Sequence, residues 1–189
     1  MKNLEDFIKV YDSVLNKQAC ETMIRMHNDN PQRLSEYNWN LGYRRFSEVN
    51  SANVPDAKEF LDVYYSRIDS VYSHYKKSVD IPFLPNKDSY TYEHVRIKKY
   101  EANDKDEFGL HVDVGDSDSS KRFLTFFIYL NDVDEGGETA FQDINNLDVL
   151  IKPKQGRMVV FPPMWMFPHR GLRPISNDKY IASTYLHYI

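Results

Sequence analysis

The sequence predicts a mainly β protein with helices near its N-terminal end. Within roughly the first 80 residues, two segments carry apolar residues at three- and four-residue steps, which is the spacing of one face of a helix. From about residue 90, the chain changes to short runs of apolar and β-branched residues separated by turn residues. Many short strands of this kind are typical of a sandwich or barrel. We therefore expect two helices that brace one sheet of a β core.

The first predicted helix follows Asn16, a candidate N-cap, and its periodic residues are Cys20, Met23, Ile24 and His27. We expect it to end near residues 30–31. The second helix, over residues 55–78, has the strongest helical pattern in the chain. Between the two, residues 31–53 show no clean period, and we expect an irregular segment with one short strand at most.

The strands are predicted from residue 92 onward. Residues 92–100 alternate in the rhythm of a strand, and the later candidates are residues 122–130, 139–141, 149–151, 157–161 and 180–187. No internal repeat, low-complexity tract or linker divides the chain. We therefore expect one domain over residues 1–189, in which residues 1–80 form a largely helical support region and residues 90–189 form the β core.

Composition disfavours two classes of partner. Apolar residues make up 41% and charged residues 28% of the chain, which is ordinary for a soluble globular protein. The formal net charge of −4 gives no general attraction for phosphate backbones, so nucleic acid is a disfavoured partner. No run of about eighteen uncharged apolar residues predicts a membrane span. The single Cys20 and the lack of a secretory pattern favour a reducing, cytoplasmic setting. The oligomeric state stays open.

The strongest chemical signal is a possible metal site. His111 and Asp113 are two residues apart, so on a strand their side chains project to the same side. His169 can join them if the fold brings a later strand alongside, as a jelly roll does. Two imidazoles and one carboxylate leave positions free on a metal, which suits non-haem Fe(II). An isolated H-x-D is nevertheless common. The histidines without a partner at ligand spacing are expected to be structural: His27, His74, His94 and His187.

Five ordered blocks make the metal interpretation more specific. They are KKY at 98–100, HVD at 111–113, RFLTFFIYLNDVDEGGETAF at 122–141, KPKQGRMVVFPP at 152–163 and PHRGLRPISNDKYIASTYL at 168–186. From Val95 onward, the chain thereby resembles the prolyl 4-hydroxylase-like branch of the Fe(II)- and 2-oxoglutarate-dependent dioxygenases. The resemblance implies a double-stranded β-helix, a distorted and cupin-like jelly roll, with His111, Asp113 and His169 as the iron ligands.

The same resemblance implies a 2-oxoglutarate site. Lys179 occupies the position of a basic residue that pairs with the far carboxylate of 2-oxoglutarate in relatives. Tyr129 and Tyr100 match tyrosines that contact 2-oxoglutarate, and Ser183 matches a small hydroxyl residue in the same pocket. The alternatives are that Lys179 is a solvated lysine at a strand start and that the tyrosines pack in the core, since the chain contains 14 Tyr.

The resemblance also implies a reaction. Fe(II), 2-oxoglutarate and O2 would hydroxylate a substrate and release succinate and CO2, with ascorbate as the reductant. The branch favours a peptidyl proline in a peptide or protein, but neighbouring branches hydroxylate free amino acids and other small molecules, and fold does not settle substrate. Substrate candidates are Arg122, which matches a peptide-contacting position in some relatives, and Trp165, which lies just before the distal histidine. Residues 39–46 and the acidic segment 102–120 are candidate lids, and the acidic segment is equally interpreted as a solvated face.

Two other functions are less compatible with the sequence. A nucleic-acid demethylase of this superfamily would favour Arg at position 179 and a basic groove, whereas this chain is net acidic. A metal-binding or oligomerising module that has lost turnover is the alternative from another class. It is disfavoured because all three ligand candidates and Lys179 are present.

Overall fold

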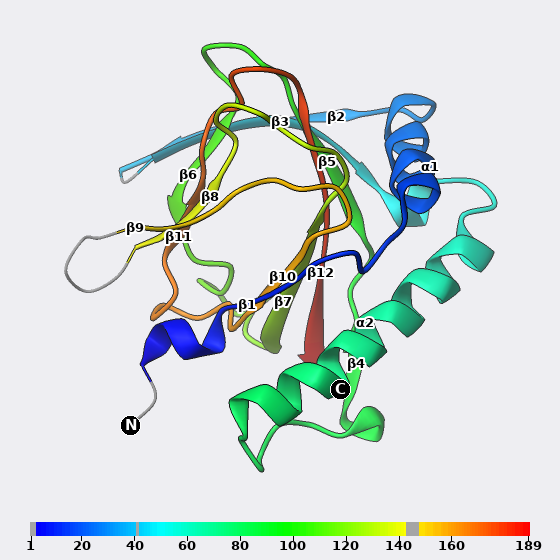
Figure 1. Ribbon diagram of the computed structural model, residues 1–189, viewed down its shortest axis with the longest axis vertical. Helices are drawn as coiled ribbons and strands as arrows, with labels where there is room; N and C mark the ends of the chain where they lie inside the picture. The colour runs from blue at the N-terminus through cyan, green and yellow to red at the C-terminus, as the bar shows by residue number, and fades with distance from the viewer. Residues whose placement is uncertain (1–2, 41, 143–147) are drawn as a thin grey trace.

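The structure, a computed structural model, describes residues 3–40, 42–142 and 148–189. Its main feature is one 12-stranded antiparallel sheet that curls on itself, with the two α-helices against one side (Figure 1). The strands, in chain order, are β1 (Lys9–Tyr11), β2 (Arg33–Trp39), β3 (Gly42–Asn50), β4 (Tyr90–Tyr92), β5 (Arg96–Tyr100), β6 (Glu107–His111), β7 (Arg122–Tyr129), β8 (Thr139–Gln142), β9 (Asp148–Ile151), β10 (Met158–Phe161), β11 (His169–Gly171) and β12 (Lys179–Tyr188).

Both predicted helices are confirmed. Helix α1 (Lys17–Asn28) begins after Asn16, whose Oδ1 accepts a hydrogen bond from the backbone N of Ala19 at 2.9 Å. This is the expected N-cap, which satisfies one of the free N–H groups of the first turn. Helix α2 (Lys58–Val79) starts three residues later than residue 55. The short 3-10 helices are η1 (Leu4–Phe7), η2 (Ser51–Asn53) and η3 (Lys87–Ser89).

The helices cover the outer face of the central strands. The α2 residues Tyr64 and Ile68 are fully buried and share a core cluster with outward-facing strand residues, namely Ile97, Leu124, Phe126, Ile128, Met158, Val160, Ala182 and Leu186. Alternate residues of the same strands point the other way into a second cluster, which includes Phe127, Tyr129, Val159 and Phe161. Because side chains alternate along a strand, the helices fix which residues of β7, β10 and β12 face the interior of the barrel.

The sheet curls because its strands are ordered β1-β10-β7-β12-β5-β3-β6-β11-β8-β9, with β2 added on β3 and β4 on β12. Strands β7, β12 and β5 form one wall, and β6, β11, β8 and β9 form the opposite wall, with β3 between them. This is the distorted jelly roll that the sequence analysis expected. The register sets His111 opposite His169 and Tyr100 opposite Lys179, so each wall brings two candidate site residues together.

The prediction for residues 31–53 was wrong. Instead of an irregular segment, β2 and β3 form a hairpin, and β3 pairs with both β5 and β6. Within β3 only Phe46 and Val49 are buried. The strand is held by backbone pairing with two neighbours, so its sequence carries little apolar alternation to recognise. Residues 1–80 are therefore less helical than expected, because they contribute β1, β2 and β3 to the sheet.

The strands predicted after residue 120 lie close to their predicted positions, whereas β1, β6 and β11 were not among the predicted ranges. Residues 92–100 form two strands rather than one, β4 and β5, and both pair with β12. Between them, the backbone N of Glu93 donates to the carbonyl of Tyr185 at 3.0 Å. Among the described residues, no helix is both long enough and apolar enough to cross a membrane.

Candidate active site

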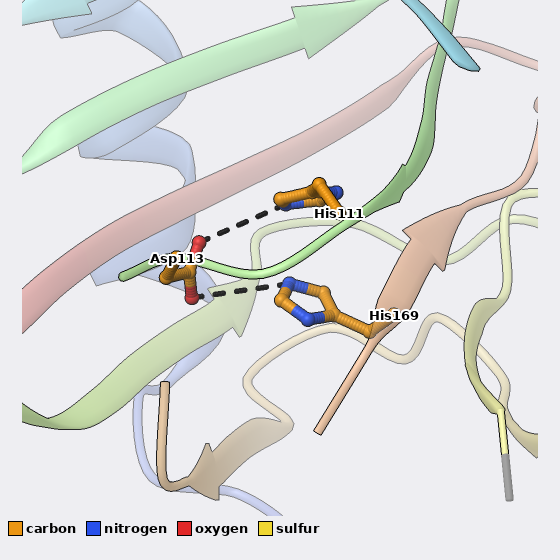
Figure 2. A group of neighbouring side chains, drawn as sticks. All are labelled: His111, Asp113 and His169. Atoms are coloured by element: carbon orange, nitrogen blue, oxygen red, sulfur yellow. Dashed lines mark ion pairs between the residues drawn. The ribbon is translucent and has the colours of Figure 1, made fainter. Parts of the chain in front are cut away.

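His111, Asp113 and His169 converge at one point inside the barrel (Figure 2). His111 ends β6, Asp113 lies two residues further on, and His169 begins β11. The Nε2 of His111 lies 3.7 Å from Asp113 Oδ1, and the Nε2 of His169 lies 3.8 Å from Asp113 Oδ2. One donor atom from each residue lies within 4.8 Å of the others. Donors at this separation can bind a single ion between them.

Backbone carbonyls fix both imidazole rings in the same tautomer. His111 Nδ1 lies 2.8 Å from the carbonyl of Gly109, and His169 Nδ1 lies 3.1 Å from the carbonyl of Phe167. Because a carbonyl can only accept, each Nδ1 carries the proton and each Nε2 keeps its lone pair for the shared space. Burial, reinforced by the neighbouring His169, lowers the pKa of His111 to about 3. His111 is therefore a neutral imidazole at physiological pH, as a metal ligand must be.

Asp113 does not lie on a strand, contrary to the expectation from the H-x-D spacing. Strand β6 ends at His111, because the backbone N atoms of Asp113 and Val114 both donate to the carbonyl of Pro163 at 3.1 Å. Arg122 Nη1 donates to the carbonyl of Asp113 at 3.0 Å. These contacts hold the loop so that the carboxylate still turns toward the two histidines.

The Asp113 carboxylate accepts two hydroxyl hydrogen bonds. Tyr185 donates to Oδ1 and Thr125 donates to Oδ2, both at 3.0 Å. Burial alone would raise the pKa of Asp113, but the two imidazoles, Lys98 and the Thr125 hydroxyl outweigh burial and lower it. The carboxylate is therefore ionised and oriented. Sequence reasoning missed Tyr185 and Thr125, which belong to no motif that marks a metal site.

The three residues line a pocket that extends to Lys179. Lys179, at the start of β12, is 2% exposed, and its Nζ donates to the carbonyls of Gly137 at 3.1 Å and Leu172 at 3.2 Å. The same Nζ lies 4.4 Å from the centre of the Tyr100 ring. Burial lowers the pKa of Lys179 to about 7, and Glu138 opposes this shift. Lys179 thus lies buried at one end of the pocket and is not a solvated lysine, and an anion beside it would favour its charged form.

Two of the three hydroxyl residues expected near 2-oxoglutarate line this pocket. Tyr100 is 2% exposed, and Ser183 is 4% exposed, with no hydrogen-bond partner for its buried Oγ among the residues that the structure describes. Tyr129 lies behind the pocket wall: its hydroxyl contacts Thr139 Oγ1 at 2.7 Å and donates to the carbonyl of Ile151 at 3.0 Å. Thr139, which sequence reasoning missed, takes the place at the pocket surface.

The two substrate candidates lie in different surroundings. Arg122 forms an ion pair with Glu93, its Cζ lies 4.0 Å from the centre of the Tyr185 ring, and it binds the Asp113 carbonyl. It therefore supports the metal loop. Trp165 is 77% exposed and is not among the residues that line the pocket. Contact with substrate stays a prediction for both residues.

The candidate lids contain regular structure. Of residues 39–46, Trp39 ends β2 and residues 42–46 belong to β3, while residue 41 lies outside the described residues; residues 102–120 include β6. Asp104, Asp116 and Asp118 are exposed, but Asp106 is 3% exposed and pairs with Arg45. Asp106 also accepts from the backbone N of Glu101 at 3.0 Å. The interpretation as a solvated face is therefore wrong for Asp106, which braces the turn into β6.

A curled jelly roll that holds two imidazoles and a carboxylate inside its barrel has the architecture of a mononuclear non-haem metalloprotein. Residues 95–187 match the family described as the 2OG-Fe(II) oxygenase superfamily, where 2OG is 2-oxoglutarate. Together, the family match and the relatives described below support a 2OG-Fe(II) oxygenase that is similar to prolyl hydroxylases. The family implies Fe(II) as the cofactor and 2-oxoglutarate and O2 as co-substrates.

The similar proteins include two from Arabidopsis thaliana. Probable prolyl 4-hydroxylase 3 is 24% identical over 204 residues, which cover 94% of this chain and 68% of that protein. Prolyl 4-hydroxylase 2 is 23% identical over 208 residues, which cover 94% of this chain and 66% of that protein. The chain thus spans about two thirds of the length of these relatives.

Solved structures share the fold. The viral collagen prolyl hydroxylase of Paramecium Bursaria Chlorella virus-1, in complex with 2OG, has a TM-score of 0.66 at 20% identity and matches over 97% of both chains. A prolyl hydroxylase of Trichoplax adhaerens, in complex with a peptide of the hypoxia inducible factor oxygen degradation domain, has a TM-score of 0.76 at 16% identity, covering 96% of this chain and 84% of that chain. At these identities the likeness concerns the fold alone.

Proposed function

We propose that this chain is an Fe(II)- and 2-oxoglutarate-dependent dioxygenase that hydroxylates a prolyl residue in a peptide or protein, with release of succinate and CO2. One observation carries the proposal: three metal-donor side chains and a buried lysine line the same pocket inside the jelly roll. Ascorbate is the proposed reductant.

His111, Asp113 and His169 are the proposed iron ligands. Their donor set of two imidazoles and one ionised carboxylate suits Fe(II) and leaves positions for other ligands. The fit is supported by the orientation of both Nε2 atoms and by the hydroxyl contacts of Asp113. Bound iron would supply the activation of O2 that the reaction requires.

Lys179 is the proposed partner of the far carboxylate of 2-oxoglutarate. Its ammonium has two carbonyl acceptors from the protein, which are neutral, so its positive charge is not balanced by an ion pair among the described residues. A buried charge without a counter-charge is costly, and a carboxylate would offset that cost. Thr139 and Tyr100 would flank the carboxylate, and Ser183 would offer a hydroxyl further along the pocket.

The protein's remaining task is placement and exclusion of water. Phe127 and Ile181 line the pocket between polar groups, and Phe127 and Phe161 pack at a centroid distance of 6.2 Å. This apolar lining would shield the reacting groups from solvent. The substrate class is supported by similarity to prolyl 4-hydroxylases of Arabidopsis thaliana.

Two assays test the proposal. The first measures conversion of 2-oxoglutarate to succinate with added Fe(II) and ascorbate. The second uses mass spectrometry to seek a gain of one oxygen in proline-containing peptides. We expect both activities in the wild type and neither in Asp113→Ala, because two imidazoles alone hold iron weakly. We expect the same loss in His169→Ala. Its matched control is His94→Ala, which should keep both activities, since His94 is exposed and lies outside the pocket. Absence of succinate under every condition would instead support the module without turnover.

Lys179→Ala tests the co-substrate site separately. We expect the 2-oxoglutarate concentration needed for half-maximal succinate formation to rise more than about tenfold, since removing one partner of a buried pair typically costs about 3–5 kcal/mol. Lys99→Ala is the control, because Lys99 pairs with Asp178 at 3.0 Å on the other face of β5. An unchanged requirement in Lys179→Ala would rule out the assigned role.

A further inference from the structure

The pocket contains a second buried lysine, Lys98 on β5, which the proposed reaction does not use. Lys98 is 8% exposed and lines the pocket together with Tyr100, two residues further along the strand. Its Nζ lies 5.2 Å from the centre of the Phe46 ring and 5.7 Å from that of Phe108. Within the described ranges, the ammonium has no hydrogen-bond acceptor and no ion-pair partner within 4.0 Å. Lys98 therefore ends among aromatic faces.

Two other cations near the pocket do have partners. Lys179 donates to two backbone carbonyls, and Arg122 pairs with Glu93. Glu48 lies opposite Lys98 in the β3–β5 register and favours its charge, yet the two do not approach within ion-pair distance. Burial lowers the pKa of Lys98 to about 8, so most of the population is still charged at pH 7. Glu48 and Asp113 thus favour the Lys98 charge only through longer-range attraction, and the ammonium itself lies against ring faces. A buried ammonium without an acceptor lowers stability unless a ligand supplies one.

A second cation lies beside the same aromatic ring. The Cζ of Arg44, on β3, lies 5.9 Å from the centre of the Phe108 ring, and the Nε of Arg44 is buried without a hydrogen-bond partner in the part of the chain that the structure describes. Phe108 in turn stacks on His111, with ring centres 3.5 Å apart and planes within 7°. Arg44 and Lys98 thus border a ring that touches a proposed iron ligand.

We propose that Lys98, with Arg44 beside it, binds a carboxylate of the primary substrate. The inference rests on the proposed function. It predicts a substrate that carries a carboxylate near the carbon that is hydroxylated. The 2-oxoglutarate dianion already has two positive partners, Lys179 at one end and the metal at the other, which leaves Lys98 for another anion. That carboxylate can be the terminal carboxylate of a proline or the side chain of an acidic residue next to it.

The test measures binding to protein loaded with Mn(II) and N-oxalylglycine, an analogue of 2-oxoglutarate. Two pairs of probes distinguish the two carboxylate sources: N-acetylproline against its amide, and N-acetyl-Glu-Pro-Gly-amide against its Gln counterpart. By calorimetry, we expect the carboxylate member of one pair to bind at least about tenfold more tightly than its neutral partner, as for other charge-assisted contacts in buried sites. The preferred pair identifies the source.

Three variants assign that preference. Lys98→Met should abolish it, Lys98→Arg should retain part of it, and Lys99→Met should leave it unchanged, because Lys99 is the neighbouring lysine on the opposite face of the strand. N-oxalylglycine affinity should stay within about twofold in Lys98→Met. Without ligands, Lys98→Met should raise the melting temperature, because the substitution removes an uncompensated buried charge.

Other outcomes overturn the inference in separate ways. Equal binding of both members in each pair, or no binding of any probe, means that the pocket does not select a carboxylate. Weaker N-oxalylglycine binding in Lys98→Met would assign Lys98 to the co-substrate. A lower melting temperature of Lys98→Met would assign it a structural role near Glu48 or Asp113. Failure of the wild type to bind Mn(II) and N-oxalylglycine would remove the proposed function itself, and this inference with it.

Discussion

Asp113 receives more support from the protein than the other two proposed ligands. Its carboxylate accepts hydrogen bonds from Tyr185 and Thr125, while its backbone is held by Pro163 and Arg122. Hydrogen-bond partners of this kind orient a ligand and tune its affinity for metal. Asp113 lies in a loop, so these contacts replace the rigidity that a strand would have given.

Tyr185→Phe tests that support at the level of one hydroxyl. We expect Mn(II) affinity to fall by about 10- to 100-fold, the usual effect of losing a hydrogen-bond partner of a metal ligand. The aromatic ring stays in place, so the urea midpoint should change little. Calorimetric titration gives the affinity, with Tyr188→Phe, an exposed position on the same strand, as control. Equal Mn(II) affinity in wild type and Tyr185→Phe would show that the hydroxyl does not orient the ligand.

At the residue scale, motif recognition predicted the cluster and the buried lysine, but not their surroundings. His111, Asp113 and His169 do converge, and Lys179 lies in the same pocket. Tyr185, Thr139 and Lys98 were missed because each is an ordinary strand residue whose importance depends on which face of its strand points inward. Which face points inward is set by the packing of the other face against the helices. A single sequence does not show this packing residue by residue.

At the scale of elements, strand β12 shows how one alternating sequence serves two purposes. Ala182 and Leu186 face the helices, while Lys179, Ile181, Ser183 and Tyr185 line the pocket. A shift of one residue in register would exchange the two sets. The strand's pairing with β5 and β7 over most of its length therefore fixes the site as well as the fold.

The turn before β10 is a second element on which the barrel depends. Gly156 has a φ of +77°, and its carbonyl accepts from the backbone N of Val14 while its N donates to the carbonyl of Tyr129. A Cβ at this position would lie 2.3 Å from the carbonyl oxygen of Leu15. The turn is thus hydrogen-bonded both to the segment before α1 and to the end of β7. Its backbone lies so close to Leu15 that only glycine fits at this position.

Gly156→Ala should therefore destabilise the fold. A left-handed backbone conformation at a non-glycine residue costs about 1–3 kcal/mol, and displacement of Leu15 adds to this. Urea unfolding measures the change, with Gly115→Ala as control, because a Cβ there would meet no atom within 4 Å. Equal midpoints for both variants would mean that the turn is not a fixed part of the barrel.

Helices and strands were predicted correctly where the spacing of apolar residues follows a buried face. They were missed where an element has no such face. Both helices and most strands after residue 120 have a buried face, and their boundaries were predicted within a few residues. The β2–β3 hairpin was missed because its residues are mostly exposed or half-buried and are held by backbone pairing. The closed jelly roll itself followed from the family resemblance, since alternation alone allowed either a sandwich or a barrel.

For the whole molecule, the buried lysines predict how stability depends on pH without ligands. Burial lowers the pKa of Lys179 to about 7 and that of Lys98 to about 8, from the ordinary value of 10.5. Between about pH 7 and 10.5 the unfolded chain therefore binds more protons than the folded chain, so the free energy of unfolding should rise with pH across this window.

Urea unfolding at pH 7 and pH 9 measures this rise. The double variant Lys98→Met/Lys179→Met should flatten it, since neither position then titrates. Saturating Mn(II) and N-oxalylglycine should also reduce the rise in stability with pH, because a carboxylate beside Lys179 favours the charged form of this lysine. A fall in wild-type stability from pH 7 to pH 9 would mean that the lysines do not carry uncompensated charge in the folded state.

The central claim is that His111, Asp113 and His169 hold one metal ion. Calorimetric titration of Mn(II) into the wild type and Asp113→Ala measures this directly, with Asp118→Ala as the control at an exposed carboxylate. We predict one ion per chain in the wild type and the control. In Asp113→Ala the affinity should fall by more than the roughly 10- to 100-fold that loss of a surrounding hydrogen-bond partner causes. Equal Mn(II) binding by the wild type and Asp113→Ala would contradict the account.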